Sequence, residues 1–171
     1  MRLIDYVNQG GSITWILVAM NIIGLSIVSW RFWVLKDFTK NSTTIADDLA
    51  NDVKKTVPGS DAMSYAKDMI TAKVSELEYG MTVIKMIATI APLLGLLGTV
   101  LGIFEAFQVI AAKGLNNPGE FASGISLALI TTIAGLIVSI PHYIAHNFLS
   151  GKLDSLEINL EKLVLPKLAG K

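Results

Sequence analysis

Two long apolar segments that carry glycine, threonine and proline constrain the fold of this chain more than any other feature. The first runs from Ala91 to Gly102 and the second from Gly124 to Pro141. A helix of this composition is unfavourable in water, whereas inside a bilayer the neighbouring helices pack against its small residues and satisfy its polar groups. The two segments therefore predict helices that pack closely within a membrane.

The composition of the chain supports the same fold class. Apolar residues make up 52% of the 171 positions and charged residues 16%, a balance typical of membrane proteins. Three windows, roughly 13 to 33, 87 to 112 and 121 to 148, are long enough to cross about 30 Å of hydrocarbon. The first window is interpreted as a retained anchor, because it begins far from a basic segment and lacks a small-residue cleavage site. We expect an all-α integral membrane protein with three transmembrane helices.

The basic residues predict how the chain crosses the membrane. Most lie between the first two windows or after the third: Arg31, Lys36, Lys40, Lys54, Lys55, Lys67, Lys73, Lys85, Lys152, Lys162, Lys167 and Lys171. Because Arg2 and Lys113 fall on the other side, the positive-inside rule places the N-terminus outside and the C-terminus in the cytoplasm. Trp30 and Trp33 would lie at the inner interface and Trp15 at the outer one.

The polar segments predict long cytoplasmic helices. Pro58 and Gly59 form a turn signal, Ser60 and Asp61 offer N-caps, and a helix should run from there almost continuously into the second span. After the third span, leucines recur at helical spacing: Leu149, Leu153, Leu156, Leu160 and Leu163. The polar face of this tail mixes both signs of charge, which favours packing against the preceding cytoplasmic helix over binding to a membrane surface.

Small residues form a stripe on each of the two inner spans. The stripes comprise Ala88, Ala91, Gly95, Gly98, Gly102 and Ala106 on one helix, and Gly124, Ala128, Thr132, Gly135 and Ser139 on the other. Such stripes let helix backbones approach closely, and a tight helix pair explains them without any further function. Pro92 and Pro141 are expected to kink their helices and to serve either as structural bends or as hinges.

Three polar residues in these spans are candidates for an ion path. Thr99 and Thr132 fall near the middle of the membrane, where their hydroxyls would either bond the preceding helical turn or line a water-filled path. Glu105 is a carboxylate inside an apolar run and lies by helical rise near the outer interface. It has two interpretations, an ion-pathway acid or a side chain that reaches the headgroups.

The remaining residues argue against an enzyme. Cysteine is absent, which excludes disulfides and thiolate chemistry. His142 and His146 have the spacing of a metal-binding pair but lack a third ligand, so a position at the inner pore mouth or interface is favoured. No nucleophile elbow, phosphate-binding loop or basic cluster for nucleic acid is present in the sequence. We therefore expect neither a bound metal nor another cofactor.

The stretches from Pro92 to Phe107 and from Gly124 to Pro141 resemble the two pore-lining helices of the ExbB/TolQ/MotA proton-channel family. The resemblance is specific over roughly residues 83 to 148 and is closest to the ExbB branch. It implies a homopentameric ring around an ExbD-like single-span partner in a bacterial inner membrane. It also implies that the proton motive force is passed to a TonB-like protein for nutrient import across the outer membrane, with the proton as coupling ion.

With this resemblance, the chain divides into seven segments. They are a periplasmic N-terminus (1–12), a first transmembrane helix (13–34), a cytoplasmic helical region (35–82), a second transmembrane helix (83–112), a periplasmic loop (113–122), a third transmembrane helix (123–148) and a cytoplasmic amphipathic tail helix (149–171).

The family's pore-lining threonines fall on Thr99 and Thr132. Many members carry a glutamate five residues before the second threonine, where this chain has Leu127. We hypothesise that Glu105 supplies part of the missing charge. Two alternatives to the ExbB-like function remain: a TolQ-like or flagellar-stator-like subunit, and a non-conducting membrane scaffold.

Overall fold

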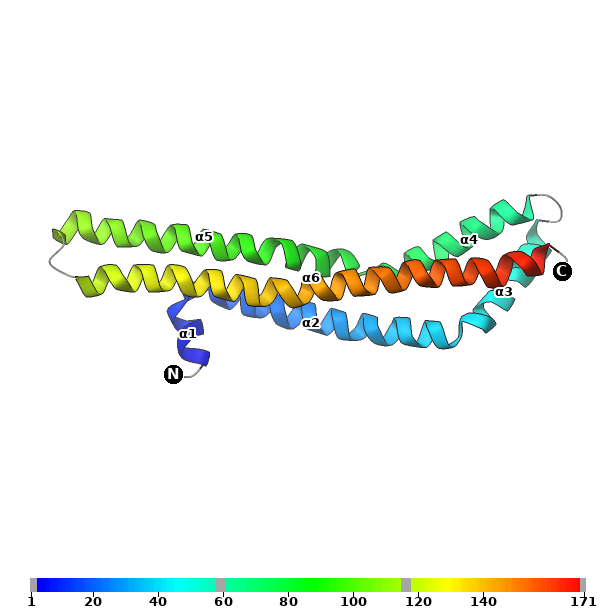
Figure 1. Cartoon of the computed structure of the whole chain (residues 1–171), viewed down its shortest axis with the longest axis horizontal. Helices are drawn as coiled ribbons and strands as arrows, with labels where there is room; N and C mark the ends of the chain where they lie inside the picture. The colour runs from blue at the N-terminus through cyan, green and yellow to red at the C-terminus, as the bar shows by residue number, and fades with distance from the viewer. Residues whose placement is uncertain (1–2, 58–60, 115–117, 170–171) are drawn as a thin grey trace. The chain divides into compact units, whose positions relative to one another are not determined.

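The computed structural model describes residues 3–57, 61–114 and 118–169, and its elements there are α-helices (Figure 1). They are α1 (Leu3–Gln9), α2 (Gly11–Lys40), α3 (Ser42–Thr56), α4 (Ala62–Leu77), α5 (Met81–Lys113) and α6 (Pro118–Leu168). The helices α2, α5 and α6 contain segments long and apolar enough to cross a membrane. The expected all-α fold with three such helices is thus confirmed. Arg2, Pro58, Gly59, Ser60 and Lys171, which carried predictions above, lie outside the described residues.

The helix predicted between Asp61 and the second span is interrupted once. Gly80, with φ 86°, interrupts the predicted near-continuous helix between α4 and α5, because this left-handed conformation is accessible to glycine and ends a helix. Asp61 stands at the N-cap position of α4 but makes no side-chain capping bond. The third span and the tail form one helix of 51 residues. Since a bilayer core takes about 20 residues, more than half of α6 must lie outside it if the helix crosses once.

The chain forms two compact units. The first unit contains Met1–Ile27 and Val83–Ala145, and in it α5 and α6 run side by side (Figure 1). A buried cluster of Leu17, Ile87, Ala91 and Val138 joins α2 to this pair. Apolar side chains elsewhere on the three helices are largely exposed, as expected for surfaces that face lipid or other subunits. Both α5 and α6 continue as helices through Pro92 and Pro141.

The second unit contains Val28–Thr82 and His146–Lys171. The buried positions of the tail are Leu149, Leu153, Leu156, Leu160 and Val164. They recur at the helical spacing that the sequence predicts, while Leu163 is only half-buried. Thr71 donates a hydrogen bond of 2.9 Å to the carboxylate of Glu157, which links α4 to α6. Lys167 of the tail also pairs with Asp47 of α3. The tail therefore packs against the polar helices of its own chain.

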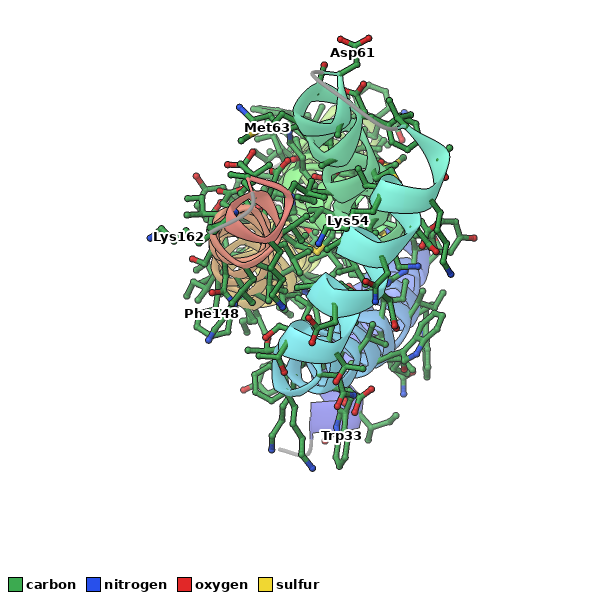
Figure 2. The ribbon with its side chains drawn as sticks, turned by 90° about the vertical axis from the view of Figure 1, so that its right-hand side faces the viewer. Trp33, Lys54, Asp61, Met63, Phe148 and Lys162 are labelled. Atoms are coloured by element: carbon green, nitrogen blue, oxygen red, sulfur yellow. The ribbon has the colours of Figure 1, made fainter. Side chains whose placement is uncertain are left out.

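Two aromatic rings of the second unit lie beside the buried side chain of Arg31. The guanidinium of Arg31 lies 5.0 Å from the centroid of the Trp30 ring and 5.6 Å from that of Tyr79. Trp33 projects from α2 (Figure 2), and its side chain is 71% exposed. Exposed tryptophans beside a cation are typical of a membrane interface; the inner-interface position of Trp30 and Trp33 stays a prediction.

Candidate functional site

The two small-residue stripes meet, and their contact positions the candidate site. A Cβ atom built on Gly135 would lie 2.6 Å from the carbonyl oxygen of Ala91 and 3.1 Å from the Cα of Gly95. One built on Gly102 would lie 2.7 Å from the carbonyl oxygen of Gly124. Because real side chains do not approach backbone this closely, glycine is what permits the distance between α5 and α6. The expected tight helix pair is present.

Thr99 and Thr132 lie opposite each other across this contact, and their hydroxyls are hydrogen-bonded to one another. The Thr99 hydroxyl also lies 3.1 Å from the carbonyl oxygen of Ala128 and 3.2 Å from that of Gly95. The Thr132 hydroxyl lies 3.2 Å from the same Gly95 oxygen. Each hydroxyl has one proton, so the pair donates one bond within itself and one to a carbonyl. The structure thus brings the two predicted threonines to one level.

Thr131 is a polar residue that the sequence analysis did not single out. Its side chain is 1% exposed and donates to the carbonyl oxygen of Ala128 at 2.9 Å. It also fills the space above Gly98, where an added Cβ would lie 2.4 Å from the threonine hydroxyl. The adjacent threonines in the third span and the glycine stripe of the second were the available signal. Thr131 packs the site, whereas Thr132 is only half-buried.

Ser139 secures the hairpin further along α6. Its hydroxyl donates to the carbonyl oxygen of Ala88 at 2.5 Å, and the side chain is buried. A hydrogen bond between membrane helices that satisfies a buried hydroxyl contributes about 0.6 to 2 kcal/mol. Polar as well as small residues of the stripes therefore hold α5 against α6.

Glu105 lies in the first unit at a cavity that neither Thr99 nor Thr132 lines. Its exposed side chain lines a cavity of about 420 Å³ together with Gln9 of α1 and Ser123, Ser126 and Leu127 of α6. Glu105 and Leu127 thus border the same space. A carboxylate introduced at Leu127 would share this largely polar cavity with the one on Glu105.

The two histidines differ in burial, since His142 is buried whereas His146 is half-buried. His142 is 0% exposed, and its Nδ1 donates to the carbonyl oxygen of Val138 at 2.7 Å. Its Nε2 has no hydrogen-bond partner and faces Gly24, where an added Cβ would lie 2.0 Å away. For His142 this differs from the expected position at the inner pore mouth or interface, because the ring is enclosed by helices of its own chain. Within the described ranges, no cluster of three metal-ligating side chains occurs.

Comparison of the sequence with known proteins identifies the family to which the chain is similar. Residues 39–162 match the model of the MotA/TolQ/ExbB proton channel family. The chain is 47% identical over 78 residues to biopolymer transport protein ExbB of Aquifex aeolicus, an alignment that covers 46% of this chain and 53% of the relative. It is 41% identical over 83 residues to biopolymer transport protein exbB1 of Vibrio cholerae, covering 48% and 36%. It is 44% identical over 73 residues to biopolymer transport protein ExbB of Neisseria gonorrhoeae, an alignment that covers 43% of this chain and 33% of the relative.

These alignments span about half or less of the relatives' lengths. The family model, in contrast, extends from the end of α2 through most of α6. It therefore includes the glycine-packed pair and both threonines. The match, the three apolar helices and the hairpin geometry agree, and the chain belongs to the MotA/TolQ/ExbB proton channel family.

Proposed function

We propose that this chain is the ring-forming subunit of an ExbB-like, proton-driven complex in a bacterial inner membrane. In this proposal five copies surround the transmembrane helices of an ExbD-like partner, with the N-terminus of each copy in the periplasm and its C-terminus in the cytoplasm. The partner passes the energy of the proton motive force to a TonB-like protein that drives nutrient import across the outer membrane. The proton is the coupling ion, and the account requires no bound cofactor.

The observation that carries the proposal is the hydroxyl pair of Thr99 and Thr132 at one level of the hairpin. A carboxylate on a partner helix that alternates between charged and neutral forms needs donors and acceptors that rearrange. Paired hydroxyls meet this need, because either can turn its proton outward while the other keeps a bond to a helix carbonyl. Both side chains are half-buried in the isolated chain, so they are not sealed within the hairpin.

The membrane potential supplies enough free energy to drive a change in the hydrogen bonds between the threonine pair and a partner carboxylate. One elementary charge that crosses about 100 mV releases roughly 2.3 kcal/mol. The glycine contacts hold α5 close against α6 within the first unit, so a ring of these hairpins would keep this part of its wall while the partner moves. Glu105 would supply negative charge near the outer entrance, in the cavity that it shares with Leu127.

The test is proton uptake by proteoliposomes that contain the complex purified with its partner. Thr99→Val with Thr132→Val removes both hydroxyls at nearly constant volume. A hydrogen bond to a charged group contributes about 1.5–3 kcal/mol, so we expect uptake to fall by roughly 10- to 100-fold. The matched control is Thr89→Val, because Thr89 is an exposed α5 threonine whose hydroxyl bonds its own helix at Lys85. Equal uptake by the double variant and the control would refute the proposed path.

A non-conducting scaffold is the second candidate, and one observation favours it. The hydroxyls of Thr99 and Thr132 have acceptors within the hairpin, so their presence is explained by packing alone. A scaffold predicts that the double valine variant keeps its partners, and that neither the variant nor the native chain takes up protons. A TolQ-like or stator-like subunit would instead conduct protons, and its partner would be a Tol-type or peptidoglycan-binding protein.

A further inference from the structure

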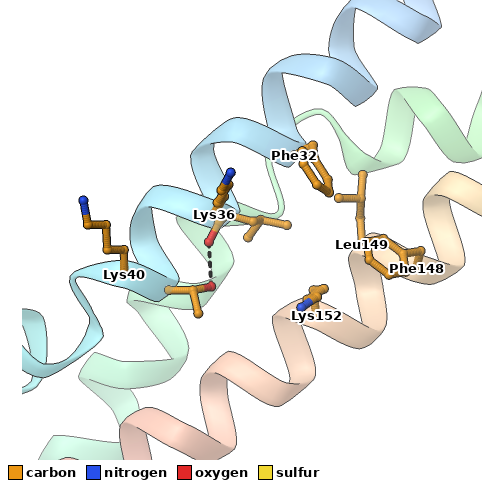
Figure 3. A pocket seen from close by; sticks show the side chains of 8 residues that line it. Phe32, Lys36, Lys40, Phe148, Leu149 and Lys152 are labelled. Carbon is orange, nitrogen blue, oxygen red and sulfur yellow. Dashed lines mark hydrogen bonds between the residues drawn. The ribbon is translucent and has the colours of Figure 1, made fainter.

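A groove in the second unit combines an apolar floor with basic side chains. It has a volume of about 400 Å³ and lies between the last turns of α2 and the start of the tail portion of α6 (Figure 3). Its lining residues are Phe32, Leu35, Lys36, Thr39, Lys40, Phe148, Leu149 and Lys152. The proposed transport function uses none of these residues.

The floor and flanks of the groove suit a hydrocarbon chain. Leu35 and Leu149 are buried at its base, whereas Phe32 and Phe148 are about half-exposed. Thr39 turns its hydroxyl to the carbonyl oxygen of Leu35 at 2.7 Å, so it presents little free polarity. Burial of exposed aromatic and aliphatic surface by an acyl chain is favourable in proportion to the area covered.

The basic side chains lie around this apolar surface. Lys36 and Lys40 are one turn apart on α2, and Lys152 stands on α6 with its Nζ 5.8 Å from the centroid of the Phe148 ring. In Figure 3 the first two extend outward from α2, whereas Lys152 stands on the facing helix. All three are exposed, and their long flexible stems let the ammonium groups close on a ligand.

The charge of the groove is uncompensated. None of the eight described residues that line it is acidic. The ion pairs found in the described ranges use other lysines, such as Lys73 with Glu76 and Lys167 with Asp47. Another hollow on α2, lined by Trp30 and Trp33, contains Asp37 and therefore lacks this single sign of charge. An anion with an apolar body is the ligand that matches both features.

We propose that the groove binds one anionic phospholipid. The phosphate lies among the ammonium groups of Lys36, Lys40 and Lys152, and an acyl chain covers Phe32 and Phe148. The sequence position of the groove supports a lipid over a soluble anion, because its lining residue Phe32 lies between Trp30 and Trp33 at the end of the apolar window 13 to 33. Basic residues at this end of a membrane helix are attracted to anionic headgroups. The proposal needs only membrane insertion of α2 and is independent of proton transport.

The test titrates the full chain, purified in mild detergent, with palmitoyl-oleoyl phosphatidylglycerol and counts bound lipid by native mass spectrometry. Each lysine at an anionic surface contributes about a fivefold gain in affinity. The variant Lys36→Gln, Lys40→Gln, Lys152→Gln should therefore bind this lipid roughly 100-fold more weakly. The matched control is Lys54→Gln, Lys55→Gln, Lys162→Gln, which removes three exposed lysines from elsewhere in the unit; Figure 2 shows Lys162 pointing outward. This control should bind as the native chain does.

Two further arms separate lipid from other ligands. Phosphatidylcholine with the same chains should bind weakly and equally to the native chain and the groove variant, and Phe148→Ala should weaken phosphatidylglycerol binding. Soluble glycerol phosphate should not displace the lipid. Equal loss in both triple variants, equal affinity for the two lipids, or displacement by glycerol phosphate would each overturn the proposal.

Discussion

Gly135→Ala tests whether close helix contact builds the first unit. The added Cβ would lie 2.6 Å from the Ala91 carbonyl oxygen and 3.1 Å from the Gly95 Cα. Both atoms belong to backbone, so relief requires α5 and α6 to separate by roughly 0.8 Å, to an ordinary contact of about 3.4 Å. Overpacking of this kind costs about 1–3 kcal/mol. We take the upper end, because backbone cannot change rotamer.

The control is Gly151→Ala, also within α6, where an added Cβ meets no atom within 4 Å. Replacing an exposed helical glycine with alanine stabilises a helix by about 1 kcal/mol. The same gain applies at position 135, so we expect a net loss of about 2 kcal/mol there and a difference of about 3 kcal/mol between the variants.

The assay for this comparison is unfolding of the full chain in mixed micelles by added dodecyl sulfate, followed by circular dichroism. The separation of the helices should also lengthen the 3.2 Å contact between the Thr132 hydroxyl and the Gly95 oxygen. If Gly135→Ala were as stable as Gly151→Ala, the glycine stripes would not be holding the hairpin together.

Two other substitutions test the contacts around the hairpin in the same assay. Gly24→Ala would place a Cβ 2.0 Å from Nε2 of His142, whose ring is already held by a hydrogen bond to its own helix. We expect the free energy of unfolding to fall by about 2 kcal/mol. Combination with His142→Ala should recover part of this loss. Unchanged stability would show that α2 does not dock through this contact. Ser139→Ala removes the bond to the Ala88 oxygen and should cost about 1 kcal/mol, whereas a neutral effect would mean that this bond adds nothing.

The sequence was sufficient to predict three long apolar helices and the pairing of the small-residue stripes on two of them. Apolar length is a one-dimensional property, and glycine, alanine and threonine at helical spacing leave few other ways to pack. The rotation of α6 against α5 could not be predicted in the same way. That Thr131 rather than Thr132 is the buried neighbour of Gly98 depends on a rotation of α6 by one residue. Spacing alone does not fix that rotation.

The surroundings of His142 and Gly80 show why other details escaped prediction. A histidine near the end of an apolar span is compatible with an interface or a core, and Gly24 on a distant helix decides between them. Gly80 is the next glycine or proline after Gly59, yet whether a glycine ends a helix or continues it depends on its φ, here 86°. The groove at Lys36, Lys40 and Lys152 joins segments more than a hundred residues apart, which no local pattern reveals.

The central claim is that this chain works as a ring around a partner that carries the proton. The most direct measurement is purification of the tagged chain from its native membrane in mild detergent, with the mass of the intact complex and the identity of every co-purifying protein determined by mass spectrometry. The account predicts five copies of this chain together with a small single-span protein that has an intramembrane aspartate, accompanied by a TonB-like protein. Recovery of the chain without any such single-span partner would contradict it.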